Sequence, residues 1–212
     1  MVLTIDGGDD KYLYNYNWGA TSKNGAAIVN IRTKYNTAGT AESATHAAGV
    51  GQGGGRSKVG QLFEIGQNAN NYSGLEIIAD VYWYGIQEII GAGGCRIIFG
   101  SSVIDDSGPT WPSSGSSYIK SDLTYVDNQA GAGIIGNPVV HDGHQKNDGT
   151  GAPSPHYISD PQQGEKYRAC AYVGTYASSP WSLASARSDA LEDGNNSFDG
   201  YILLQGLQFN WV

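Results

Sequence analysis

Charged residues are scarce in this chain. Of its 212 residues only 15% are Asp, Glu, Lys or Arg, and the formal net charge is −8. The 12 Lys and Arg residues are scattered singly, without a basic run or tail. Because neutralising nucleic-acid phosphates requires clustered cations, we expect no nucleic-acid partner.

Long apolar runs are also missing. No stretch approaches the roughly 18 apolar residues that a membrane helix requires, so we expect no membrane partner. The first ten residues, MVLTIDGGDD, lack the basic and apolar regions of a signal peptide. We therefore expect synthesis in the cytoplasm without an export signal.

Cysteine is limited to Cys95 and Cys170, each inside a strand-like run. A single disulfide between neighbouring strands is one interpretation of this pair. We favour two buried free thiols, because free cysteine is a common core residue.

Motifs that dictate a reaction are absent as well. The sequence has no G-x-S-x-G element and no phosphate-binding loop, and neither cysteine has a neighbouring histidine. The paired carboxylates of a glycosidase leave no local signature, so the acids on or near strands, Glu64, Glu76, Asp80 and Glu88, are the ones to inspect. We predict a protein without enzymatic activity and without a cofactor.

What the chain does have is glycine, tyrosine and alternating strands. It contains 31 Gly and 14 Tyr. Two runs, 75–84 and 201–212, alternate apolar and polar residues with period two, as strands do when one face packs on a core. They are the longest and most apolar runs, and we predict that they form the central strands of a sandwich.

The whole pattern predicts an all-β fold, an antiparallel sandwich or jelly roll of about nine strands. Runs 75–84 and 95–99 are expected to form a hairpin through the turn GAGG. One short helix is predicted near 180–192, because Pro180 suits a first helical position and Gly194 follows the segment.

Residues 36–56 are small, glycine-rich and nearly free of large apolar side chains. They predict a long loop or hinge. The chain then divides into 1–57, strands plus this loop, and 58–212, the sandwich. Whether 1–57 is separate or part of the same domain stays open.

Four aromatic residues share one face of a predicted strand, and they are Tyr12, Tyr14, Tyr16 and Trp18. One interpretation is an exposed aromatic platform on which sugar rings or a partner stack. The other is a strand face that is buried against the core or against another subunit. We favour burial, because aromatic residues dominate core and interface energetics. Trp211 is expected to join such a contact.

Two further groups of candidates lie mainly on expected loops. Trp111, Tyr157 and Trp181 are candidates for stacking on a glycan. His141, His144 and Asp148 have side chains suited to binding a metal ion. A solvated polar loop is the interpretation we favour for this second group.

The run 75–84, the Gly/Ser/Asn-rich loops and the closing GYILLQGLQFNWV together resemble phage virion surface proteins, namely head-decoration (cement) proteins and receptor-binding tips of tail fibres. The closing strand is similar to the last strand of TNF- or C1q-like jelly-roll trimers. The resemblance implies a homotrimer located in the virion, attached to other virion proteins and without enzymatic activity.

Two functions follow as expectations. The first is a structural virion surface protein, on a capsid or a fibre, that acts by self-assembly and protein–protein contact. The alternative is a carbohydrate- or receptor-binding module that takes a host glycan. A glycan hydrolase would in addition require two facing carboxylates in a cleft.

Overall fold

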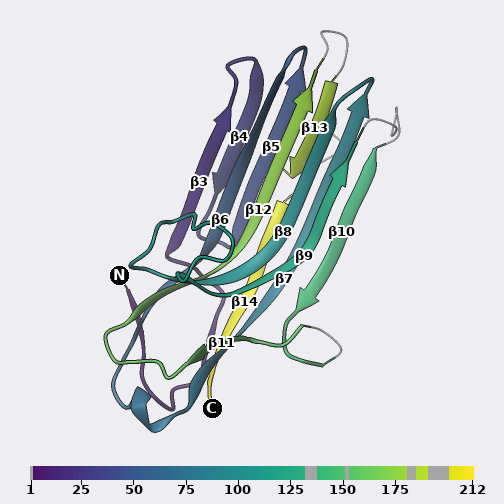
Figure 1. Cartoon of the computed structure of the whole chain (residues 1–212). Coiled ribbons are helices and arrows are strands. Elements are labelled where there is room, and N and C mark those ends of the chain that lie inside the picture. Colours follow the sequence, from purple (N-terminus) through teal and green to yellow (C-terminus); the bar gives the residue numbers. More distant parts are fainter. Residues whose placement is uncertain (1, 132–137, 151–152, 181–184, 191–200) are drawn as a thin grey trace.

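The computed structural model is a sandwich of two β-sheets, the fold class that the alternating runs predict (Figure 1). Its described residues contain fourteen strands and a single turn of 3-10 helix, η1 (Ala69–Asn71). The structure describes residues 2–131, 138–150, 153–180, 185–190 and 201–212, without the side chains of 185–189.

One sheet has six strands in the order β1-β6-β12-β8-β9, with β3 paired to β6 on the same edge as β1. All its pairings are antiparallel except that of β1 with β6. The strands are β1 (Leu3–Ile5), β3 (Trp18–Gly25), β6 (Gly51–Ile65), β8 (Gly94–Asp105), β9 (Ile119–Ala130) and β12 (Lys166–Ser179).

The other sheet has eight strands in the order β10-β7-β13-β5-β14-β2, with β11 paired to β7 and β4 to β5. In Figure 1 the two sheets lie as long layers, one behind the other. The strands are β2 (Lys11–Leu13), β4 (Val29–Tyr35), β5 (Thr40–Ala48), β7 (Gly74–Ile90), β10 (Val139–Lys146), β11 (His156–Ser159), β13 (Ser185–Ala190) and β14 (Tyr201–Trp211).

The two runs predicted to be central are confirmed as neighbours, because β7 and β14 pair antiparallel along most of β14. Ile77 and Val81 of β7 are fully buried, as the alternation predicts. Across the interior, the rings of Phe209 on β14 and Phe63 on β6 meet edge to face, 5.0 Å apart. The core is therefore the layer of apolar side chains between the sheets.

The loop or hinge predicted for 36–56 is wrong, because β5 and the first part of β6 occupy most of it. Small residues are needed here since the two sheets approach closely. A Cβ on Gly55 would lie 2.7 Å from the Ser43 side-chain oxygen of the facing sheet. Strands from 1–57 thus contribute to both sheets, β3 to one and β4 and β5 to the other.

The predicted hairpin is also wrong. Strands β7 and β8 are consecutive but belong to different sheets, so the turn between them crosses the sandwich. A turn sequence specifies a reversal of the chain, and it does not specify whether the reversed strand pairs or crosses over.

The helix predicted near 180–192 is wrong over 185–190, where β13 pairs with β5 on one side and β7 on the other. Two flanking ladders outweigh the local helix-start signals. The rest of that segment lies outside the described residues. Within the part of the chain that the structure describes, no helix has the length and apolar character to cross a membrane.

Candidate ligand-binding groove

The outer face of the six-stranded sheet carries the side chains that alternate with core residues. On β12, Val173 and Thr175 are buried between the sheets, so Tyr172, Gly174 and Tyr176 point outward. Two adjoining cavities of about 530 and 490 Å³ open on this face. We call the two together the groove.

Strand register aligns outward residues in a row across the middle of the groove. Arg56 on β6 pairs with Gly174 on β12. Gly174 pairs in turn with Ile98 on β8, and Ile98 with Asp127 on β9. Arg56, Ile98 and Gly174 line both cavities, so the groove is continuous across this row.

A tyrosine lies on each side of the central row. Tyr176 is 38% exposed, and its hydroxyl donates to Oε1 of Gln52 at 2.9 Å. Tyr172 is half-buried, with its hydroxyl 3.3 Å from the Thr124 hydroxyl. Gly174, between them, has no side chain, so the floor dips between two rings.

The segment 106–118, which joins β8 to β9, closes one end of the groove by lying across the sheet (Figure 1). Trp111 in this segment lines the groove, and Lys58 of β6 lies beneath it with Nζ 4.4 Å from the centre of the indole ring. Nζ also donates to the Thr110 carbonyl at 3.4 Å. Burial lowers the pKa of Lys58.

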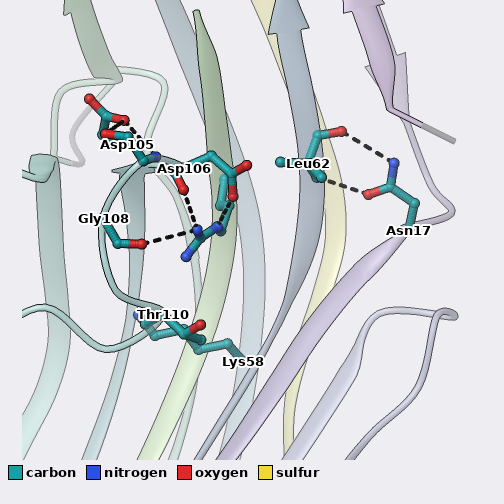
Figure 2. Close-up of polar contacts among 9 residues, drawn as sticks. Asn17, Lys58, Leu62, Asp105, Asp106, Gly108 and Thr110 are labelled. Atoms are coloured by element: carbon teal, nitrogen blue, oxygen red, sulfur yellow. Dashed lines mark hydrogen bonds and ion pairs between the residues drawn. The ribbon is translucent and has the colours of Figure 1, made fainter.

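Arg168 on β12 anchors the same segment. Its guanidinium is ion-paired with the Asp106 carboxylate and donates to the carbonyls of Asp106 and Gly108, the latter at 3.2 Å. Figure 2 shows Asp106, Gly108 and Thr110 along the segment, with Lys58 directed toward Thr110. Two buried cations therefore hold the wall of the groove in place.

The charges of the groove are partly paired. Arg96 donates from Nε and Nη2 to the two Asp127 carboxylate oxygens, each at 2.7 Å. This bidentate pair lowers the pKa of Asp127 and raises that of Arg96. Asp122, near Lys58, has its pKa raised by burial.

The acids of the groove are poorly placed for glycoside hydrolysis. Among the described residues that line it, the carboxylates are Asp122 and Asp127. Their partners on β8 are Ser102 and Ile98, so the backbone positions of the two acids are about 13 Å apart along the sheet, at roughly 3.3 Å per residue. Glycosidase carboxylates lie roughly 5–9.5 Å apart.

The acids singled out from sequence lie elsewhere. Glu64 is on the six-stranded sheet and is ion-paired with Lys166 at 3.4 Å. Glu76, Asp80 and Glu88 all belong to β7 of the other sheet, so the structure does not bring them to Glu64.

The predicted glycan-stacking residues are dispersed. Trp111 lines the groove. Tyr157 lies on β11 of the other sheet, where it is 42% exposed and its hydroxyl donates to the Ser73 carbonyl at 3.1 Å. Trp181 falls outside the described residues.

The metal-site candidates are not brought together. His141 and His144 stand three apart on β10, so they face opposite sides of that strand. His141 contacts Gln87 at 2.6 Å, and His144 contacts Asp80 at 2.6 Å. Asp148 instead accepts from Thr150 in the following turn. The described residues hold no cluster suited to a metal ion.

The four N-terminal aromatic residues do not share one strand face, because β2 ends at Leu13. Tyr16 is buried in the core, while Tyr14 is 64% exposed. Trp18 begins β3, with the Arg168 guanidinium 5.5 Å from its ring centre. At the other end of the chain, the Trp211 ring packs 5.3 Å from that of Tyr72.

Sequence reasoning missed most of the groove, including Arg56, Arg96, Tyr172 and Tyr176. These residues come from three strands that are far apart in the chain and adjacent in the sheet. The alternation within each strand indicates an outward side chain. Only the order of the strands shows that these side chains are neighbours.

Both cysteines are buried and free, as the favoured interpretation predicts. Cys95 faces the core, where burial raises the pKa of its thiol to about 11. Cys170 belongs to the outward series of β12 and is nevertheless fully buried. Its thiol lies 3.4 Å from the Ser102 hydroxyl, and burial raises its pKa too.

Comparison of the sequence with protein-family models and with curated proteins finds no match. Several solved structures share a weak likeness of shape. A family 11 carbohydrate-binding module from Clostridium thermocellum, in complex with a mixed-linked tetrasaccharide, has 8% identity and a TM-score of 0.28, covering 92% of this chain and 95% of that one.

A family 11 xylanase from Neocallimastix patriciarum has 10% identity and a TM-score of 0.30, covering 96% and 100% of the two chains. A structure of infectious bursal disease virus has 8% identity and a TM-score of 0.25, covering 97% of this chain and 43% of that one. The function is argued below from the geometry of the groove.

Proposed function

We propose that this chain is a non-enzymatic glycan-binding protein and that its site is the groove of the six-stranded sheet. The observation that carries the proposal is the alignment of Trp111, Tyr172 and Tyr176 along one open, polar groove. Aromatic faces pack on the C–H faces of sugar rings, and neighbouring polar side chains bind the hydroxyl groups. Ligand sites combine apolar surface with a few polar groups in this way.

The shape of the groove favours a chain of sugars over a single sugar. On β8 the lining residues run from Gly94 to Ile104, which at roughly 3.3 Å per residue is about 33 Å. The wide separation of Asp122 and Asp127 fits binding without hydrolysis.

Binding to a glycan array, followed by calorimetry on the best oligosaccharide, tests the proposal. Tyr176→Ala should weaken binding at least about ten-fold, because one stacked ring contributes on the order of 1–3 kcal/mol. The matched control is Tyr157→Ala, which removes a tyrosine of similar exposure (42% against 38%) from the other sheet. Absence of binding to every glycan, or equal losses in the two variants, would contradict the proposal.

A structural virion role, with self-assembly into a homotrimer, is the second candidate. An exposed aromatic patch on the eight-stranded sheet favours it. Tyr12 and Tyr14 are 41% and 64% exposed with ring centres 4.7 Å apart, and Tyr82 stacks on His144 at 3.9 Å. Exposed aromatic clusters are common in protein interfaces.

Sedimentation, which measures the oligomeric state, tests this second role. A trimer that dissociates in Tyr14→Ser would support it, and a stable monomer at micromolar concentration would contradict it. The patch and the groove lie on different sheets, so a receptor-binding tip could use both.

A further inference from the structure

The groove carries an unusual share of positive charge for this chain. The protein has 12 Lys and Arg against 20 Asp and Glu, yet Arg56, Lys58 and Arg96 all line this one surface. The acids beside them are Asp122 and Asp127. The groove is thus locally cationic on an acidic protein.

The three cations differ in what they can offer a ligand. Arg96 is committed to the bidentate pair with Asp127. Lys58 is only 5% exposed and lies under Trp111. Arg56 is exposed, and it forms neither a hydrogen bond nor an ion pair with any residue that the structure describes.

Arg56 is also the central cation of the groove. It lines both cavities, and its Cγ lies 3.9 Å from the position of a Cβ on Gly174. Its stem therefore lies beside the open dip in the floor. Its exposed side chain lines the groove beside Gly174, the residue that separates Tyr172 from Tyr176 on β12.

We infer that Arg56 binds the carboxylate of an acidic sugar, so that the preferred ligand is a glycan containing uronic acid. This inference rests on the proposed glycan-binding function and names its substrate class. A guanidinium binds a carboxylate through two parallel hydrogen bonds, and the fixed fork selects this planar group. Tyr172 and Tyr176 would pack on the sugars to either side.

The alternative use of Arg56, as a structural cation, finds no support in its contacts. Structural arginines of this chain have partners, as Arg168 has Asp106 and Arg96 has Asp127. An arginine that has no partner among the described residues and lies beside a glycine in a groove is poised for an external anion.

The test compares two probes with the same sugar backbone. Hexagalacturonate carries carboxylates, and its methyl ester carries none. Calorimetry at fixed ionic strength should show at least about ten-fold tighter binding of the acid, since a hydrogen bond to a charged group contributes roughly ten-fold or more. Arg56→Gln should remove most of this preference, weakening binding of the acid far more than binding of the ester.

Arg32→Gln, an exposed arginine of β4 on the other sheet, is the matched control and should leave both affinities unchanged. Equal binding of acid and ester by the unmodified protein would overturn the inference while leaving glycan binding intact. An unchanged preference in Arg56→Gln would overturn it as well. If neither of these probes and no neutral glycan binds the protein, the proposed function itself would be overturned.

Discussion

Gly174 lies directly opposite Arg56 in the pairing of β12 with β6, and a Cβ at Gly174 would meet only Arg56 and Ile98, each at 3.9 Å. This contact is ordinary in length, so a side chain fits there without disturbing the fold. The glycine therefore leaves open space that the fold itself does not need. That space is the floor of the groove.

Filling the open space at Gly174 should weaken glycan binding without lowering the stability of the fold. Gly174→Val places a β-branched side chain in the dip and should weaken glycan binding at least about ten-fold. Its unfolding free energy should stay equal or rise by up to about 1 kcal/mol, because valine favours strands. Calorimetry and urea unfolding measure the two effects, and unaltered affinity would show that ligands bypass Gly174.

Gly55 should respond in the opposite way. Its Cβ would lie 2.7 Å from the Ser43 hydroxyl and 2.8 Å from the Thr33 methyl group, both in the facing sheet. Gly55→Ala should therefore destabilise the protein by about 1–3 kcal/mol through overpacking. Gly174→Ala is the matched control in urea unfolding, and equal stability of these two alanine variants would refute the close approach of the sheets.

The anchor of segment 106–118 can be tested through Cys170. This thiol faces outward but is fully buried, close to Lys58, whose ammonium group donates to the Thr110 carbonyl of the segment. Arg168→Ala should loosen the segment and raise the rate of Cys170 modification by DTNB at least about ten-fold, because local opening limits access. Measurements in a Cys95→Ala background report Cys170 alone.

The control for this experiment is Arg96→Ala. It removes another ion-paired arginine from the same face, but one whose partner, Asp127, lies outside the segment. Its Cys170 modification rate should match that of the parent. Equal rates in both arginine variants would show that Arg168 is not the anchor.

His156 should make the fold sensitive to acid. It bridges the sheets, with Nε2 and Nδ1 each 2.8 Å from a hydroxyl, those of Ser101 and Ser121. Burial lowers its pKa from 6.5 to about 4. Between these pH values the unfolded chain takes up a proton that the folded chain does not, so stability falls as the pH falls.

The loss should reach about 3 kcal/mol by pH 4, at roughly 1.4 kcal/mol per pKa unit. Urea unfolding of the parent and of His156→Gln from pH 7.5 to pH 4 measures it. The variant should lose this contribution and show a shallower slope over that range. Parallel curves would mean that His156 does not carry the effect.

The sequence predicts the fold class well because strand alternation is local. Ile77 and Val81 are buried as their spacing indicates, and β7 and β14 are the central pair. The prediction fails at Gly55, where a small residue reflects close packing of sheets instead of a loop. It fails at 185–190 because two neighbouring strands decide the conformation there.

The groove could be predicted only in part. Trp111 stands out in the sequence, since a tryptophan in a loop between prolines has no evident core role. Arg56 and Tyr176 do not stand out, because each is one outward residue in an alternating strand. Their proximity depends on a sheet order that joins β6, β12 and β8.

The position of β14 has a consequence for biosynthesis. Both β5 and β7 take partners from 185–190 and 201–211, more than 90 residues later in the chain. A nascent polypeptide therefore leaves the ribosome with those edges open until translation reaches Trp211. Such non-local pairing slows folding to the native state. It also leaves unpaired, aggregation-prone strand edges that chaperones must cover.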